Sequence, residues 1–80
     1  ELQQERLLSV TLPAAAACVG RKLGHLALHA VGVHVVSVRL AAGQVRHADD
    51  ELPLSAGDTL VLSGLPEPLA LAEAKLLGGD

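Results

Sequence analysis

The sequence has no Phe, Trp, Tyr or Met among its 80 residues, and Cys18 is its only cysteine. Without aromatic side chains the chain has no surface on which nucleic-acid bases could stack, which argues against binding of single strands. A single cysteine allows neither a disulfide within the chain nor a cysteine-rich zinc site. The formal net charge of −3 argues against a nucleic-acid module, because such modules are normally basic.

Long apolar runs are absent as well. The longest one near the N-terminus is Pro13–Val19, which Gly20–Lys22 closes, whereas a bilayer-spanning helix needs about 18–20 apolar residues. No basic region precedes this run, as a signal peptide would require. We therefore expect a soluble cytoplasmic domain over residues 7–78, with residues 1–6 as a linker to the rest of a longer protein.

Half of the residues are nevertheless hydrophobic, so the core must consist of Leu, Val and Ala side chains. A chain of this length buries only about 60–65% of the surface that its unfolded form exposes, and its own core is marginal. Burial against a second copy is the simplest way to gain stability without a disulfide or a metal. The composition therefore predicts a homodimer.

The apolar pattern predicts a strand and then a helix in the first part of the chain. Apolar and polar residues alternate from Leu8 to Leu12, the period of a half-buried strand, and Pro13 ends it. From Val19 to Ala30 the apolar residues have helical spacing, and Gly32 ends this predicted helix.

The strongest strand prediction covers Val33–Leu40, where valine is frequent. Strict alternation would place its apolar residues on two faces, with Val36, Val38 and Leu40 on one and Val33 and Val35 on the other. Ala42-Gly43 then indicates a hairpin, after which residues 44–46 can pair back as a short strand.

The last part of the chain predicts a turn, a strand and a helix. Gly57-Asp58 is a tight-turn pair, so Asp58 is interpreted as a turn residue and not as a catalytic carboxylate. The strand Thr59–Ser63 follows, and a helix then runs from Pro66 to Leu77 with Gly78 as its C-cap. The predicted inner face of this helix holds Leu69, Ala72 and Leu76. The fold class is therefore α+β: a small, mostly antiparallel sheet with helices packed on it, in the order strand, helix, strand, strand, strand, helix.

Two histidines in the first predicted helix are candidate site residues. His25 and His29 are four positions apart, a spacing that places two imidazoles on one helix face, as metal ligands often are. Arg21 and Lys22 share this face, and their positive charges oppose a divalent cation but favour an anion. A solvated or interfacial face is the simplest interpretation, an anion site is the functional alternative, and a metal site is disfavoured.

Gly24 and Leu28 are the predicted dimer contacts. Leu28 lies opposite the buried stripe of the predicted helix, and Gly24 would allow a second copy to approach closely. The alternative for Leu28 is an ordinary exposed leucine, which proteins tolerate freely. Cys18 is expected to be a small buried side chain, and the acidic run Asp49–Glu51 is expected to be solvated. No nucleophile elbow, phosphate-binding loop or paired-carboxylate motif is present, so we expect no enzyme.

Four segments stand in an order and spacing typical of one domain family. They are Val19-Gly-Arg-Lys-Leu23, Gly32-Val-His-Val-Val-Ser-Val-Arg39, Leu54-Ser-Ala-Gly-Asp-Thr-Leu-Val-Leu62 and Gly64-Leu-Pro-Glu-Pro-Leu69. Together they resemble the TrkA-C (RCK-C) regulatory domain of bacterial potassium channels and cation:proton antiporters. The resemblance covers nearly the whole chain, from about Leu7 to Leu77.

The Ala-rich closing segment Leu69–Leu77 is most like the C-terminal domain of Kef-type bacterial cation:proton antiporters. One feature departs from the family pattern: members usually carry a proline near positions 47–50, whereas this chain has only Pro53 in that loop. The departure concerns the conformation of the loop.

The resemblance implies a cytoplasmic regulatory, ligand-sensing and dimerisation domain of a bacterial potassium or monovalent cation transporter, such as a potassium:proton antiporter, at the cytoplasmic face of the inner membrane. The alternatives are a purely structural dimerisation domain and the C-terminal domain of a separate Trk/Ktr-type channel-gating subunit. No cofactor is implied, and NAD(H) is not expected because the nucleotide-fingerprint glycines of the neighbouring family domain are absent from the chain.

Some members of the family bind anionic nucleotides, cyclic di-AMP among them, between two C-terminal domains. The resemblance therefore implies an anionic small-molecule ligand in the dimer cleft, held by charge-assisted contacts to its phosphates. The side chains available for such contacts are Arg21, Lys22, His25, His29 and Arg39.

Overall fold

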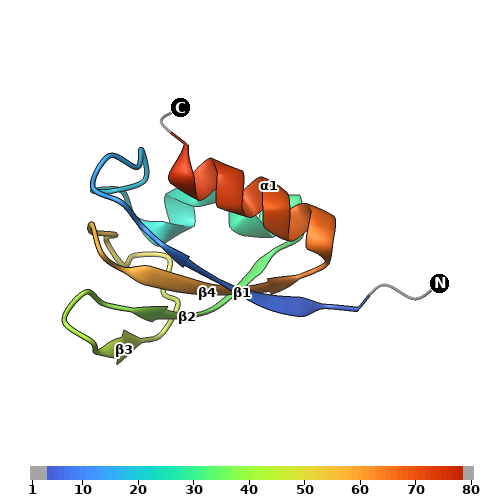
Figure 1. Ribbon diagram of the computed structural model, residues 1–80. Helices are drawn as coiled ribbons and strands as arrows, with labels where there is room; N and C mark the ends of the chain where they lie inside the picture. The colour runs from blue at the N-terminus through green and yellow to red at the C-terminus, as the bar shows by residue number, and fades with distance from the viewer. Residues whose placement is uncertain (1–3, 79–80) are drawn as a thin grey trace.

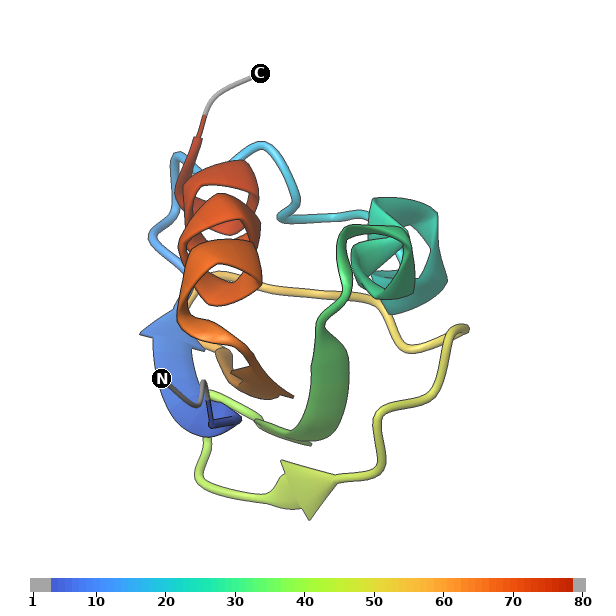
Figure 2. The ribbon, with the colours of Figure 1, turned by 90° about the vertical axis from the view of Figure 1, so that its right-hand side faces the viewer.

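The computed structural model describes residues 4–78. Its elements, with η denoting a 3-10 helix, are β1 (Arg6–Thr11), η1 (Leu23–Leu26), η2 (Leu28–Val31), β2 (His34–Arg39), β3 (Val45–Arg46), β4 (Thr59–Gly64) and α1 (Pro66–Leu77). The strands form one sheet in the order β1-β4-β2-β3, and every neighbouring pair is antiparallel. Figures 1 and 2 show α1 and the two 3-10 helices side by side on one face of this sheet. The predicted α+β architecture is confirmed.

The strands β1 and β4 pair along their whole length, so their alternation continues across both. Val10 lies opposite Leu60, and both are buried on the face that the helices cover. Thr11 lies opposite Thr59, and their hydroxyl oxygens are 2.8 Å apart. Residues 1–3 of the predicted linker lie outside the described part of the chain, and Arg6, also assigned to the linker, begins β1.

The strand β2 contains a bulge that the sequence pattern did not predict. Val35 pairs with Leu62 and Ser37 with Val61, so Val36 is an extra residue with no partner across the ladder. The bulge changes which face the later residues occupy. Val36 is 48% exposed, whereas Val38 is fully buried in the same core as Val33. The prediction that Val36 and Val38 share a face, opposite Val33, is therefore wrong.

The predicted helix from Val19 to Ala30 is also wrong, because this segment forms two separate 3-10 helices. Ala27 stands between them in the left-handed region, with φ 50° and ψ 43°. In a continuous helix Leu26 and Leu28 would point about 200° apart, yet both are buried here. The break at Ala27 is what allows both leucines to enter the core.

The helix α1 closes the domain as predicted. Its buried residues are Leu69, Ala72 and Leu76, and Gly78 occupies the C-cap with its N–H donating to the carbonyl of Ala74. The thiol of Cys18 is buried beneath the end of this helix and donates to the carbonyl oxygen of Leu76 at 3.4 Å. Burial raises the pKa of the Cys18 thiol above its ordinary value of 9.0.

Candidate functional site

The loop that follows β3 is bound to the segment before and within η1 by backbone hydrogen bonds. The N–H of Leu23 donates to the carbonyl of Leu52 at 2.8 Å, and the N–H of Gly24 donates to the carbonyl of Asp50 at 2.9 Å. A bridge between Lys22 and Pro53 continues the pairing. These bonds hold residues 50–53 against the 3-10 helices, and Ala48 and Asp50 of this loop line the candidate site.

The loop leaves no room for a side chain at Gly24. A Cβ built at Gly24 would lie 2.7 Å from the Cβ of Asp50 and 3.0 Å from its carbonyl oxygen, distances at which one of the two segments must move. Gly24 was predicted to allow close approach of a second copy; in the structure it allows close approach of Asp50 of the same chain.

A cavity of about 160 Å³ opens between η2, the start of β2 and this loop. Its lining consists of Leu23, Gly24, Ala27, Leu28, His29, Val33, His34, Val35, Ala48 and Asp50. Six of these ten residues are aliphatic, but polar atoms make up more than half of the accessible wall, and the ionisable side chains are two imidazoles and one carboxylate. Its volume is below the roughly 300–1,000 Å³ typical of pockets for drug-sized molecules, so it suits a small ion or a single polar group of a larger ligand.

The structure does not bring the five predicted ligand contacts together at the cavity. All five side chains are exposed; His29 lines the cavity, whereas Arg21, Lys22, His25 and Arg39 lie outside its lining. Because Ala27 breaks the predicted helix, the helical i, i+4 face that was to carry both His25 and His29 does not form.

Lys22 already has an anionic partner. Its ammonium nitrogen lies 2.7 Å from a carboxylate oxygen of Glu51, and the two side chains are 50% and 75% exposed. An ion pair this accessible to water contributes little to stability. A ligand would therefore meet Lys22 with its positive charge already paired to the carboxylate of Glu51.

Arg39 lies at the opposite end of β2 from the cavity. It pairs with Thr59 of β4 and Val45 of β3, while His34 begins the same strand. The strand between the two is about 16 Å long at the usual rise per residue.

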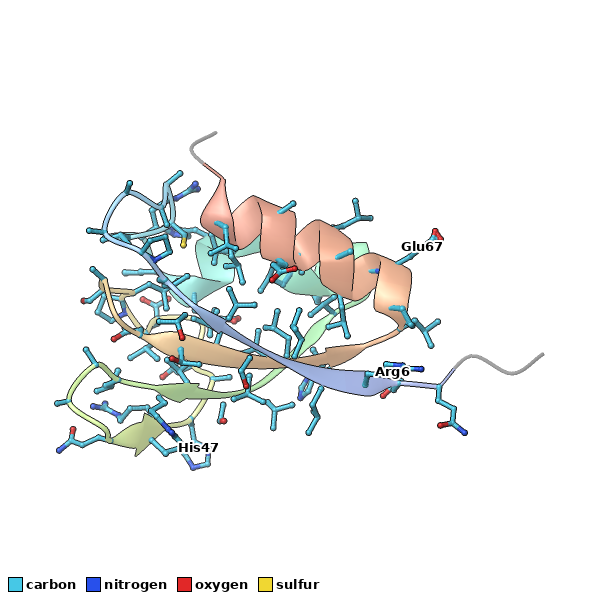
Figure 3. The ribbon with its side chains drawn as sticks, in the orientation of Figure 1. Arg6, His47 and Glu67 are labelled. Atoms are coloured by element: carbon cyan, nitrogen blue, oxygen red, sulfur yellow. The ribbon has the colours of Figure 1, made fainter. Side chains whose placement is uncertain are left out.

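The histidine that follows β3 lies far from the helices. Figure 3 shows His47 at the β3 side of the sheet, away from α1.

Leu28 is not the exposed leucine that the sequence pattern predicted. It is 3% exposed, belongs to the core of the chain and forms part of the cavity wall. The reason is again Ala27, which turns η2 so that Leu28 faces inward. A contact between Leu28 and a second copy would require the core to open.

Two residues of the cavity were not among the predicted ligand contacts. His34 lies inside the Gly32–Arg39 segment, and the only feature of the sequence that could have indicated a site there is a histidine between two valines. Asp50 belonged to an acidic run that is normally solvated. The loop pairing brings Asp50 to the same cavity as His29, which lies 21 positions earlier in the chain.

The sequence matches the family model of the TrkA-C domain over residues 7–77. The chain belongs to the TrkA-C domain family. TrkA-C domains are regulatory domains of potassium-transport proteins, so this family has a regulatory and not a catalytic role. No curated protein matches the chain.

Within residues 4–78 of this TrkA-C domain, no helix has the length and apolar character needed to cross a membrane. The same residues contain no group of three or more His, Cys, Asp or Glu side chains that could hold a metal ion.

Proposed function

We propose that this TrkA-C domain is the cytoplasmic ligand-sensing and dimerisation domain of a bacterial potassium or monovalent cation transporter, most like a Kef-type potassium:proton antiporter, at the cytoplasmic face of the inner membrane. The observation that carries the proposal is the family match over residues 7–77. The cavity supports it, because a regulatory domain needs a place where a ligand can bind. The proposed partners are a second copy, the parent transporter and an anionic small molecule such as a cyclic dinucleotide or nucleotide.

Regulation by a ligand has a definite physical requirement. The ligand must bind one arrangement of the domains more tightly than another, and it shifts the equilibrium only by that difference in affinity. The cavity walls come from η2, the start of β2 and the loop after β3, so a ligand that contacts all three favours the arrangement in which they lie together.

The function is tested on the parent protein. Potassium flux through the transporter in sealed vesicles should respond to cyclic di-AMP or ATP, and deletion of residues 7–77 should abolish the response while leaving the transport pathway in place. Flux that is the same with and without these residues, at every ligand concentration, would show that the domain does not regulate transport.

The ligand is tested on the domain itself. In an NMR titration with cyclic di-AMP, ATP and inorganic phosphate, amide shifts should change from Arg21 to His29 and around the cavity. If they stay constant at millimolar ligand, the domain is a dimerisation element alone and the sensing occurs elsewhere in the protein.

The second candidate is a domain of a separate Trk/Ktr-type channel-gating subunit. The coding sequence upstream decides between the two parents: repeated apolar segments of about 20 residues indicate a transporter, and a nucleotide-binding domain by itself indicates a gating subunit.

A further inference from the structure

The charge of the cavity depends on few groups. Its aliphatic walls carry none, and the ionisable side chains among its lining residues are His29, His34 and Asp50. Asp50 is kept at the rim because its backbone carbonyl accepts the N–H of Gly24 at 2.9 Å. The rim therefore combines one carboxylate with two imidazoles.

The loop and η1 do not supply a fixed positive charge to the cavity. On the loop, Glu51 is paired with Lys22 at 2.7 Å, and the carboxylate of Asp49 accepts the N–H of Glu51 at 2.9 Å. All four histidines are exposed, but His25, on η1, and His47, after β3, lie outside the cavity lining.

The sheet and α1 leave the cavity without a fixed charge as well. In β4, the residue opposite His34 is the neutral Ser63, and Arg39 is at the far end of β2. From α1, the uncharged Pro68 lies near the turn at Gly32. The ammonium group of Lys75, also on α1, donates to the carbonyl oxygen of Leu26, and neither residue lines the cavity.

We propose that this cavity binds one anionic group of the ligand together with protons taken up by His29 and His34, so that affinity rises as the pH falls. The inference rests on the proposed ligand-sensing function and adds its regulation. With neutral imidazoles, an entering anion meets only the carboxylate of Asp50 and is repelled. With two imidazolium groups present, the charge at the rim changes from negative to positive.

Sulfate is the appropriate probe, because it remains a dianion between pH 5.5 and 8 and any pH dependence then belongs to the protein. We expect its affinity, measured by NMR titration of the chain at constant ionic strength, to be at least about tenfold higher at pH 5.5 than at pH 8. The amides that respond should be those around the cavity, Leu23–His29 and Val33–Val35.

Three variants separate the contributions. The double variant His29→Gln/His34→Gln keeps hydrogen-bonding side chains but cannot gain charge, so its sulfate affinity should be low and independent of pH. Asp50→Asn should bind sulfate about three to ten times more tightly at pH 8, since it removes the repelling charge. His47→Gln is the matched control, because His47 is an exposed histidine outside the cavity lining and was not a predicted ligand contact, and it should behave like the unaltered chain.

The outcomes distinguish this inference from the function on which it rests. An absence of sulfate binding at every pH, or the same pH dependence in the double variant as in the unaltered chain, would overturn the proton-linked site. Tighter binding of guanidinium at pH 8 than of sulfate at pH 5.5 would overturn it too, by showing a cation site. Loss of ligand control over potassium flux concerns the regulatory function instead and is measured on the parent transporter.

Discussion

The carboxylate of Asp58 accepts a hydrogen bond from the backbone N–H of Ala41 at 3.1 Å. Its second oxygen accepts the N–H of Ser55 at 2.9 Å, and the residue is only 2% exposed. One side chain thus joins the β2–β3 hairpin to the turn before β4. Asp58 is a structural residue, as the turn pattern indicated.

Replacing Asp58 tests this role. In Asp58→Asn an amide group replaces one carboxylate oxygen and can no longer accept both backbone N–H groups, which leaves a buried donor unsatisfied. We expect a loss of about 1–3 kcal/mol in the free energy of unfolding, measured by urea denaturation. Asp49→Asn is the control, because Asp49 makes the same kind of bond, to the N–H of Glu51, on the exposed surface. Equal losses in the two variants would contradict the prediction.

Gly57 should tolerate no side chain. Its φ is +90°, and a Cβ there would lie 3.0 Å from the Cβ of Ala41. Gly57→Val should therefore lower the free energy of unfolding by about 1–3 kcal/mol, measured by thermal or urea denaturation. An unchanged melting temperature would show that the turn assignment is wrong.

A matched control separates strain from contact at this turn. Gly20 has φ +89°, and a Cβ added there would meet no atom within 4 Å, so it shares the left-handed backbone without the neighbour. Gly57→Ala should destabilise the domain more than Gly20→Ala does, and the difference measures the contact with Ala41. The reverse order would contradict the contact.

How much of this structure the sequence could predict depends on the range of the forces involved. The strands β1 and β4 and the inner face of α1 follow from local alternation and helical spacing, and were predicted. The bulge at Val36 and the left-handed Ala27 were not, because each is set by a distant partner: the pairing of β2 with β4 and the core that receives both Leu26 and Leu28. The cavity was missed for the same reason, since the loop must fold back before Asp50 meets His29 and His34.

Gly24 can be tested in the same way. Gly24→Ala would place its methyl group against Asp50, so we expect faster hydrogen exchange at the amides of Leu23 and residue 24 and a lower melting temperature. Asp50→Gly in the same chain should restore part of the loss, because it removes the nearest side-chain atom. If Gly24→Ala instead weakens dimerisation without changing the melting temperature, the contact is with a second copy.

The pKa of Cys18 gives a pH dependence of stability. Because burial raises the thiol pKa in the folded state, the folded chain holds this proton more tightly than the unfolded chain. The associated stability is complete below the ordinary value of 9.0 and is lost as the pH rises above it. Urea denaturation from pH 8 to 10 should show a steeper decline for the unaltered chain than for Cys18→Ala; parallel declines would contradict a buried thiol.

The homodimer remains a prediction and is tested by sedimentation equilibrium, which should give twice the 8.2 kDa mass of the chain at micromolar concentration. Leu7 is 69% exposed on β1 and Leu71 is 63% exposed on α1. Because Leu8 and Val10 of β1 face the core, Leu7 lies on the sheet face that the helices leave uncovered. Leu7→Ser and Leu71→Ser therefore probe opposite layers, and the one that lowers the average mass locates the interface. A single 8.2 kDa species of the unaltered chain at hundreds of micromolar would refute the dimer.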